Sequence, residues 1–201
     1  MLKRGFDILV SGAGLVVFAP VSLLIAIAIK LEDGGPVLFT QDRVGRHGRV
    51  FPAFKFRSMV VDAEKATGAV QATANDPRVT RVGRVLRATA FDELPQLLNV
   101  LRGDMSVVGP RPLRPGEADT TADGRHLPLT AIRGYEARHR VRPGLTGLAQ
   151  VYAARDLPRP GKFRYDLLYQ RRASLWLDLR LILVSFWITL RGRWEDRGPK
   201  V

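Results

Sequence analysis

The stretch from Thr89 to Pro112 reads Thr-Ala-Phe-Asp-Glu-Leu-Pro-Gln-Leu-Leu-Asn-Val-Leu-Arg-Gly-Asp-Met-Ser-Val-Val-Gly-Pro-Arg-Pro. It places two adjacent carboxylates, Asp92 and Glu93, near the start of a predicted short helix, and it ends with Arg111 between two prolines. The proline after Arg111 favours an extended backbone at the arginine. A rigidly held arginine suits bidentate contact with a phosphate or a carboxylate. The stretch therefore predicts a site that handles a phosphate group with the help of a metal ion.

The middle of this stretch has the apolar spacing of an amphipathic helix. Its leucines follow i, i+3, i+4, i+7 spacing and are Leu94, Leu97, Leu98 and Leu101. We expect a helix over residues 92–101 that is capped by Thr89 or Asp92 and ends near Gly103. An acid pair at a helix start also commonly serves only to cap the helix and complement its dipole. The segment alone leaves both interpretations open.

Composition limits the classes of protein to which the chain could belong. The 201 residues suit one domain, and 32 Lys and Arg against 19 Asp and Glu give a net charge of +13. This excess indicates anionic partners, such as nucleic acid, an anionic membrane surface or phosphorylated substrates. Without cysteine, the chain has no disulfide, thiolate nucleophile or Cys-based zinc site. Its three histidines are far apart in sequence, which argues against a His-based metal site.

Residues 1–30 are predicted to be embedded in a membrane. A nearly uninterrupted apolar run extends from Ile8 to Ile29, and about 20 apolar residues span a bilayer. Hydropathy alone favours a spanning helix, and the run is too long for a cleaved signal peptide. However, Pro20 breaks the run, and basic residues flank both of its ends. These features favour a re-entrant helix, broken at Pro20, that enters and leaves on the cytoplasmic side.

Two basic segments precede the acid pair. Residues 34–56 predict a β-hairpin, turning at Gly45–Gly48, with basic and polar side chains near one end, namely Gln41, Arg43, Lys55 and Arg57. Charges on an edge strand can also serve only to block aggregation. Further on, Asn75 or Asp76 is expected to cap a helix with arginines at every third position, namely Arg78, Arg81, Arg84 and Arg87. These arginines form either a solvated face or a cationic wall next to Asp92.

Three segments after Arg111 carry weaker signals. Residues 143–151 read as a Gly-punctuated loop that runs into a strand and could bring backbone N–H groups close to phosphate. Residues 162–172 predict a helix that places Asp166 among basic neighbours. The apolar, Trp-containing segment 175–194 suits a helix in the membrane interface, with a core helix as the alternative.

Several long motifs in order resemble the bacterial sugar transferases, in their small monotopic form as polyprenyl-phosphate phosphoglycosyl transferases. The motifs that carry the resemblance begin at Gly35 (Gly-Pro-Val-Leu-Phe-Thr-Gln-Asp-Arg-Val-Gly), Phe54 (Phe-Lys-Phe-Arg-Ser-Met), Asp92 and Arg142 (Arg-Pro-Gly-Leu-Thr-Gly-Leu-Ala-Gln-Val). The resemblance implies transfer of a sugar phosphate from a UDP-sugar to undecaprenyl phosphate, with release of UMP.

The resemblance also assigns roles to individual residues. It implies that Asp92 attacks the β-phosphate to form a covalent aspartyl intermediate, and that Asp92 is associated with Mg²⁺. It implies that Glu93 is the second acid of the pair and that Arg111 holds phosphate. The full set of predicted substrate-binding residues is Lys55, Arg57, Arg87, Arg111, Arg142 and Asp166.

The predicted fold is α+β, with a membrane-embedded helix over residues 1–30 and a small mixed α/β catalytic domain over residues 31–201. We expect the domain to lie on the cytoplasmic face of the bacterial inner membrane, in contact with membrane lipids. The chain departs from the family at Ala19, where relatives have Ser before the proline, and at Tyr152-Ala-Ala-Arg155, where they often have Asn-Gly. The sequence does not identify the UDP-sugar or decide whether the chain forms a homo-oligomer.

A membrane-anchored module that binds nucleic acid or anionic lipid is the competing hypothesis. The net charge and the arginine series from Arg78 to Arg87 motivate it. Aromatic residues are scarce among these arginines, and no nucleic-acid-binding motif is present. We therefore expect no nucleic acid among the partners.

Overall fold

The computed structural model describes residues 2–63, 65, 76–120, 126–154 and 156–194. Two positions named above, Asn75 and Arg155, lie outside these residues. The described chain is a mixed α/β structure whose strands form three two-stranded sheets. This agrees with the predicted mixture of helices and small sheets.

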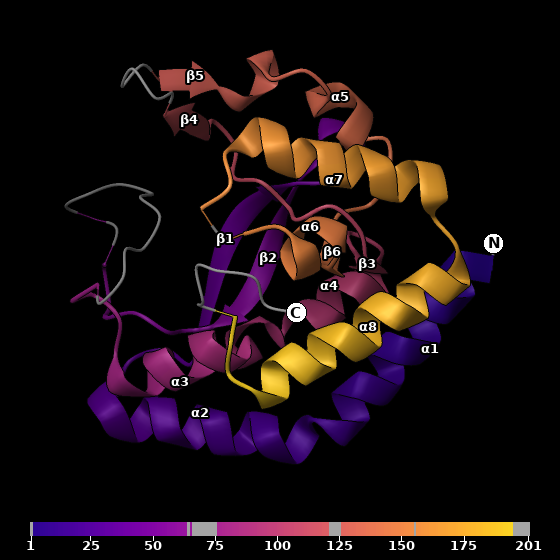
Figure 1. The fold of residues 1–201 in the computed structure, drawn as a ribbon. Helices are drawn as coiled ribbons and strands as arrows, with labels where there is room; N and C mark the ends of the chain where they lie inside the picture. Colours follow the sequence, from indigo (N-terminus) through magenta and orange to yellow (C-terminus); the bar gives the residue numbers. More distant parts are fainter. Residues whose placement is uncertain (1, 64, 66–75, 121–125, 155, 195–201) are drawn as a thin grey trace.

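The N-terminal apolar segment forms two helices, α1 (Leu2–Val17) and α2 (Ala19–Asp33), bent by 57° relative to each other (Figure 1). Within the described residues no single helix is long and apolar enough to cross a membrane. The two helices of the bent pair meet the requirements of length and composition only when they are taken together. The break falls at Phe18 rather than at Pro20. Pro20 lies in the first turn of α2, where its missing N–H removes no helical hydrogen bond.

The predicted hairpin is confirmed. Strands β1 (Leu38–Val44) and β2 (Val50–Phe56) pair in antiparallel register, and a short 3₁₀ turn, η1 (Arg46–Gly48), joins them. The side chain of Asn99 links this hairpin to the centre of the molecule. Its Oδ1 accepts a hydrogen bond from the Phe54 N–H at 3.0 Å, and its Nδ2 donates to the Pro52 carbonyl at 2.8 Å.

Helix α3 (Arg81–Thr89) begins later than predicted. Its N-cap is Thr80, whose hydroxyl accepts from the Gly83 N–H at 2.9 Å. Asp76 does not cap it, because its buried carboxylate accepts from the backbone N–H and the guanidinium of Arg78. Arg78 therefore precedes the helix, and only the last three of the four arginines lie on α3.

The central segment also departs from the predicted helix over residues 92–101. The chain forms a 3₁₀ turn, η2 (Phe91–Glu93), and then helix α4 (Gln96–Arg102), which ends at Gly103 as predicted. No side chain caps α4, since Thr89 closes α3 and Asp92 lies in η2. Of the leucine stripe, Leu97 is buried but Leu98 is 41% exposed. Asn99 and Val100, which lie outside the leucine stripe, are fully buried, so the buried face of α4 is not the predicted leucine face.

Strand β3 (Ser106–Val108) leads to Arg111 and pairs in parallel with β6 (Gly144–Thr146). The prediction of a strand at the end of segment 143–151 was wrong, since residues 148–152 form helix α6 (Leu148–Tyr152). The glycines of this segment allow close backbone packing instead. A Cβ on Gly144 or Gly147 would overlap the backbone of Gly109, which directly follows β3.

The rest of the chain surrounds this centre. Strands β4 (Ala118–Thr120) and β5 (His126–Pro128) form an outer hairpin, followed by η3 (Leu129–Ala131) and α5 (Tyr135–Arg138). Helix α7 (Arg159–Arg172) confirms the predicted helix over 162–172, and α8 (Leu175–Leu190) follows. One side of α8 belongs to the core through Leu181 and Ile188, as the core-helix interpretation expects. Its other side exposes Trp176 and Leu183, where an interfacial role stays a prediction.

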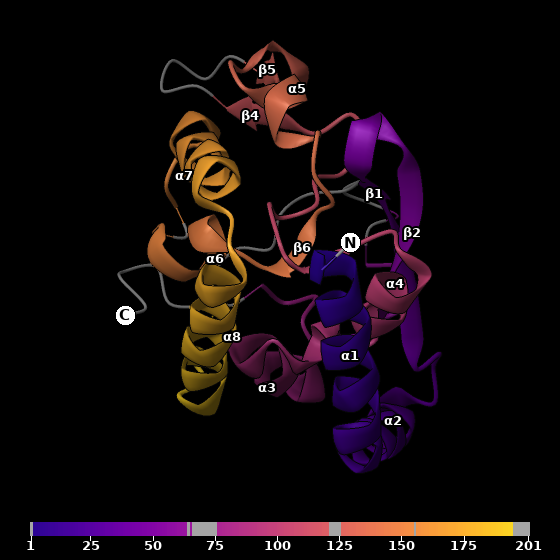
Figure 2. The same cartoon turned by 90° about the vertical axis from the view of Figure 1, so that its right-hand side faces the viewer.

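Figures 1 and 2 show the same arrangement from two sides. Helices α1, α2 and α8 lie at one end of the molecule, with α3 beside them. Strands β4 and β5 and helix α5 lie at the opposite end. The hairpin β1–β2 runs along the molecule between these two ends (Figure 2).

Candidate active site

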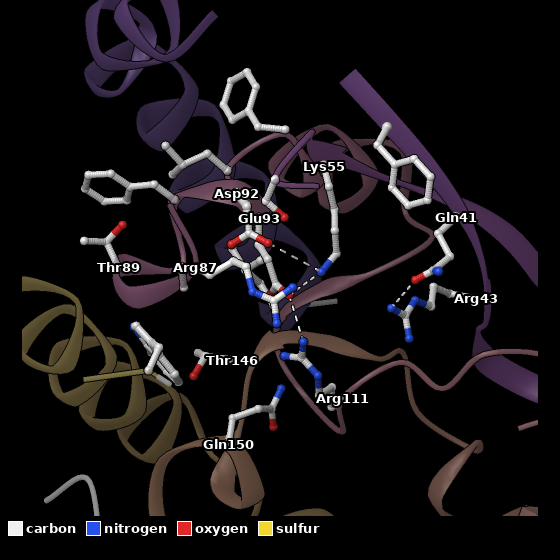
Figure 3. Close-up of a pocket in the computed structure, with 18 of the residues that line it drawn as sticks. Gln41, Arg43, Lys55, Arg87, Thr89, Asp92, Glu93, Arg111, Thr146 and Gln150 are labelled. Carbon is white, nitrogen blue, oxygen red and sulfur yellow. Dashed lines mark hydrogen bonds and ion pairs between the residues drawn. The ribbon is translucent and has the colours of Figure 1, made fainter. Parts of the chain in front are cut away.

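A cavity of about 930 Å³ lies between these two ends, and the acid pair lines it (Figure 3). The hairpin β1–β2, the turn η2 and the segment after β3 supply about half of its charged side chains. Apolar side chains come from Val10 of α1, from Ile182 and Phe186 of α8, and from Phe18 at the break between α1 and α2. The cavity thus joins a cationic region to an apolar one.

A tight backbone turn places the two carboxylates. Ala90 ends α3 in the left-handed conformation, with φ 58° and ψ 20°, and the chain enters η2 directly after it. A non-glycine residue in this conformation costs about 1–2 kcal/mol relative to a helical one. The turn brings Asp92 and Glu93 to the cavity next to Arg87 from the end of α3 (Figure 3).

The two acids have different partners although they are adjacent. Lys55 Nζ lies 2.6 Å from Glu93 Oε1 and 3.9 Å from Asp92 Oδ2. Arg111 Nη2 donates to the same Glu93 oxygen at 2.8 Å. Glu93 is therefore held by two cations, whereas the Asp92 carboxylate keeps a looser contact with one of them.

These contacts move the pKa values of the two acids in opposite directions. Burial raises the pKa of Asp92 above its usual range, Lys55 opposes that shift, and the charge of Glu93 adds to it. Burial also works to raise the pKa of Glu93, but Arg111 and Lys55 outweigh it and hold that pKa well below its usual range. The site thus keeps Glu93 charged and gives Asp92 the more basic carboxylate.

Arg111 is held through its backbone as well as through its side chain. Its backbone carbonyl accepts a hydrogen bond from Arg138 Nη2 at 2.7 Å. Arg138 is buried and donates through Nε to Asp166 at 2.9 Å. A buried arginine needs such a carboxylate, because desolvation of its charge is otherwise costly. The predicted residue Asp166 therefore lines the cavity and also anchors the arginine that positions Arg111.

The structure brings most of the predicted site residues together, but not all of them. Lys55, Arg87 and Arg111 line the cavity close to Asp92 and Glu93. Arg57 also lines it, but its guanidinium binds Asp33 and the Pro36 carbonyl.

Arg142 is not among the lining residues of the described chain, because its Nε donates to the Gly103 carbonyl at 2.8 Å, at the end of α4. Direct contact of these residues with substrate stays a prediction.

Several lining residues were absent from the predicted site. They include Gln41 and Arg43 on β1, Thr146 on β6, Gln150 on α6 and Trp194 after α8. Directly paired residues of antiparallel strands share a face, so the pairs Gln41–Ala53 and Phe39–Lys55 place Gln41 and Lys55 together. Strand alternation could therefore have extended the site from Lys55 to Gln41 and Arg43. No local signal connects Trp194 to it.

The donor set is compatible with the predicted Mg²⁺. No cluster of three or more His, Cys, Asp or Glu side chains that could hold a metal occurs in the described part of the chain. Mg²⁺ is commonly held by one or two carboxylates together with substrate phosphates and water. Asp92 fits such a role because its carboxylate is held less closely than that of Glu93. The assignment of Asp92 to Mg²⁺ stays a prediction.

Comparison with known proteins identifies the family of the chain. The family described as bacterial sugar transferase matches residues 1–192, and the chain belongs to this family. The chain is 47% identical over 190 residues to an undecaprenyl-phosphate glucose phosphotransferase of Komagataeibacter xylinus, covering 91% of this chain and 35% of that protein.

Two further relatives show similar identity. The exopolysaccharide production protein PSS of Rhizobium leguminosarum bv. phaseoli is 46% identical over 187 residues, covering 90% of this chain and 92% of that protein. A UDP-N-acetylgalactosamine-undecaprenyl-phosphate N-acetylgalactosaminephosphotransferase of Aeromonas hydrophila is 44% identical over 196 residues, covering 95% of this chain and 44% of that protein. The chain thus spans less than half of the length of the K. xylinus and A. hydrophila relatives.

Proposed function

We propose that the chain transfers a sugar phosphate from a UDP-sugar to undecaprenyl phosphate and releases UMP. The observation that carries this proposal is the division of partners between the two acids. Glu93 is held by Lys55 and Arg111, while the more basic carboxylate of Asp92 is left to react. Two relatives are named as undecaprenyl-phosphate phosphotransferases of glucose and of N-acetylgalactosamine, and these names support this class of substrate.

In the proposed first step, an oxygen of the Asp92 carboxylate forms a bond to the phosphorus that carries the sugar. The bond from that phosphorus to the bridging oxygen breaks, and UMP leaves with the oxygen. In the second step, an oxygen of undecaprenyl phosphate attacks the same phosphorus, and the carboxylate of Asp92 is released. Covalent catalysis of this kind divides one difficult transfer into two easier ones.

The surrounding cations offset the charge that the reaction brings together. A carboxylate that attacks a phosphate meets like charge, so preorganised positive groups lower the barrier. Lys55, Arg87 and Arg111 supply such groups around Asp92. Mg²⁺, held by Asp92 and phosphate oxygens, would add positive charge at the diphosphate.

The apolar surface supports a membrane location for the acceptor lipid. Helices α1, α2 and α8 expose large apolar side chains at one end of the molecule, including Leu9, Leu24 and Phe186. We propose that this end is embedded in the cytoplasmic membrane, with the bent pair α1–α2 as a re-entrant hairpin and the catalytic domain on the cytoplasmic face. The undecaprenyl chain would then stay in lipid while its phosphate reaches the cavity.

The test is UMP release from a panel of UDP-sugars with Mg²⁺ and undecaprenyl phosphate. Asp92→Asn should abolish turnover, because a neutral amide is a poor nucleophile for phosphorus. The matched control is Asp42→Asn, which changes an exposed aspartate on β1 outside the cavity and should retain activity. The wild type, incubated with the UDP-sugar alone, should gain the mass of one phosphosugar. Full activity of Asp92→Asn would refute the mechanism.

A further inference from the structure

Arg43 differs from four other arginines of the cavity in the partners it has. Its Nη1 donates to the Pro112 carbonyl at 3.1 Å, and its Nη2 donates to Gln41 Oε1 at 2.5 Å. Both acceptors are neutral. Among the described residues, no carboxylate lies within ion-pair distance of Arg43, whereas Arg57, Arg111, Arg138 and Arg159 each pair with one.

The electrostatic surroundings of Arg43 are unfavourable to its charge. Burial lowers the pKa of Arg43 to about 10, and the neighbouring charges of Arg111 and Arg114 contribute in the same direction. Glu93 and Glu117 offset this effect only in part. A partly buried charge without an opposite charge is costly to the folded protein. An anion that enters the cavity would remove that cost.

The hydrogen bonds to Gln41 and Pro112 fix where the guanidinium lies. Gln41 and Arg43 are two residues apart on β1, and their side chains therefore lie on the same face of the hairpin as Lys55 (Figure 3). Pro112 directly follows Arg111, so the Pro112 carbonyl connects Arg43 to the segment that holds Arg111. Arg43 and Arg111 thus form a pair of fixed guanidinium groups that line one cavity.

We propose that Arg43 is a second phosphate-binding arginine, which contacts a substrate phosphate oxygen from the hairpin side of the cavity while Arg111 acts beside Asp92. This inference rests on the proposed function, because it assumes that phosphate enters the cavity. The phosphate can come from the nucleotide diphosphate or from the polyprenyl phosphate, and the chemistry of contact is the same for both.

The first measurement is equilibrium binding of UDP and of uridine to the full chain in detergent, which needs no turnover. Arg43→Gln should weaken UDP binding about ten- to hundredfold, the range of a charge-assisted hydrogen bond, and leave uridine binding within about twofold. Arg43→Lys, which keeps the charge, should recover part of the loss. Arg49→Gln is the matched control, because Arg49 lies on the same hairpin, is exposed and does not line the cavity.

A second measurement separates direct contact from an effect through Arg111. If Arg43 only holds the Pro112 carbonyl, then Arg43→Gln should have no further effect in a chain that already carries Arg111→Gln. If Arg43 contacts phosphate itself, the double variant should bind the phosphate that Arg43→Gln weakens, whether UDP or the lipid phosphate, more weakly than either single variant does. A double variant that binds this phosphate as well as Arg111→Gln does would overturn the proposal.

The same variants with a short-chain polyprenyl phosphate identify the source of the phosphate. A loss confined to UDP assigns Arg43 to the nucleotide, and a loss confined to the lipid assigns it to the acceptor; either result supports the contact. Equal binding of every phosphate by wild type and Arg43→Gln, with unchanged thermal unfolding, refutes this inference alone. A wild type that binds none of these phosphates refutes the proposed function, and this inference with it.

Discussion

Asp92 and Glu93 illustrate how one residue step along a chain can separate two chemical roles. Both side chains are largely buried in the same cavity, so burial acts on both in the same direction. The difference arises from the cations, since Arg111 and the nearer contact of Lys55 both go to Glu93. An anchored acid beside a more basic one is the arrangement expected when the first orients cations and the second reacts.

This asymmetry predicts opposite shifts in the pH dependence of two variants. In the proposed mechanism Asp92 attacks as the anion, so activity should be present above the pKa of Asp92 and be lost as the pH falls through it. Lys55 lowers the pKa of Asp92 and Glu93 raises it. Lys55→Met should therefore move the acid limb of kcat/KM to higher pH, and Glu93→Gln should move it to lower pH, each by about 1 pH unit. The measurement is UMP release across the pH range.

The relevant quantity is the pH at which kcat/KM falls, and not the maximal rate. Both variants alter the active site and should lower the maximal rate as well. Arg49→Gln, outside the cavity, should leave the limb where it lies in the wild type. A limb that moves to higher pH in Glu93→Gln would contradict the role assigned to Asp92.

At the residue scale, the sequence identified the site residues whose conformation depends on their neighbours in the chain. Asp92 and Glu93 lie near the start of a predicted helix, and Arg111 lies between prolines, so local patterns were informative. The partners of the other charged residues could not be read in this way. Arg138 and Asp166 pair across 28 positions, and Arg57 and Asp33 pair across 24. A chain with 32 basic residues offers no local signal that separates a paired arginine from Arg43.

At the scale of elements, the contact between β3 and β6 positions Arg111. Three glycines allow it, because a Cβ on Gly144 or Gly147 would overlap backbone atoms of Gly109. The loop was expected to bring its backbone close to phosphate, but in the structure that backbone packs closely against the strand that leads to Arg111. Residues 148–152 were mistaken for a strand because a five-residue apolar segment does not distinguish a helix from a strand.

Gly144→Ala should therefore destabilise the protein and impair catalysis. The added methyl group would force β3 and β6 apart, at a cost of about 1–3 kcal/mol or more. Its thermal unfolding temperature should fall, together with the rate of UMP release. Gly12→Ala is the matched control, because Gly12 lies inside α1 with nothing within 4 Å of an added Cβ. That variant should be neutral or more stable by about 0.5–1 kcal/mol, as expected for alanine in a helix. Equal unfolding temperatures for the two variants would contradict this account.

At the scale of the whole molecule, both ends of the bent pair α1–α2 are attached to the rest of the chain, which is the predicted catalytic domain. Near the start of α1, Lys3 donates to Asp178 at 2.6 Å, and Arg4 donates to the carbonyls of Val100 and Leu101. At the end of α2, Glu32 accepts from the Arg81 N–H at 2.7 Å. The sequence showed Lys3 and Arg4 only as flanking charges, because Asp178, Val100 and Leu101 lie about 100 or more residues away.

This attachment predicts the topology of the hairpin in the membrane. If the catalytic domain lies on the cytoplasmic face, both ends of the pair must lie there too, since each end contacts that domain. The chain has no cysteine, so single substitutions can report the side on which a residue lies. Leu2→Cys reports the start of α1, where Leu2 is 80% exposed, and Arg49→Cys reports the catalytic domain.

We expect Leu2→Cys and Arg49→Cys to be protected from a membrane-impermeant thiol reagent in intact cells and to react once the cells are permeabilised. Val17→Cys, at the bend and 68% exposed, should stay protected from the impermeant reagent even then, because lipid would cover it. Equal labelling of all three positions after permeabilisation would show that the bend is not embedded. Labelling of Leu2→Cys alone from outside intact cells would show that the segment crosses the bilayer. The contacts of Lys3 and Arg4 with the catalytic domain could then not form in the membrane, because their partners would lie on the opposite side.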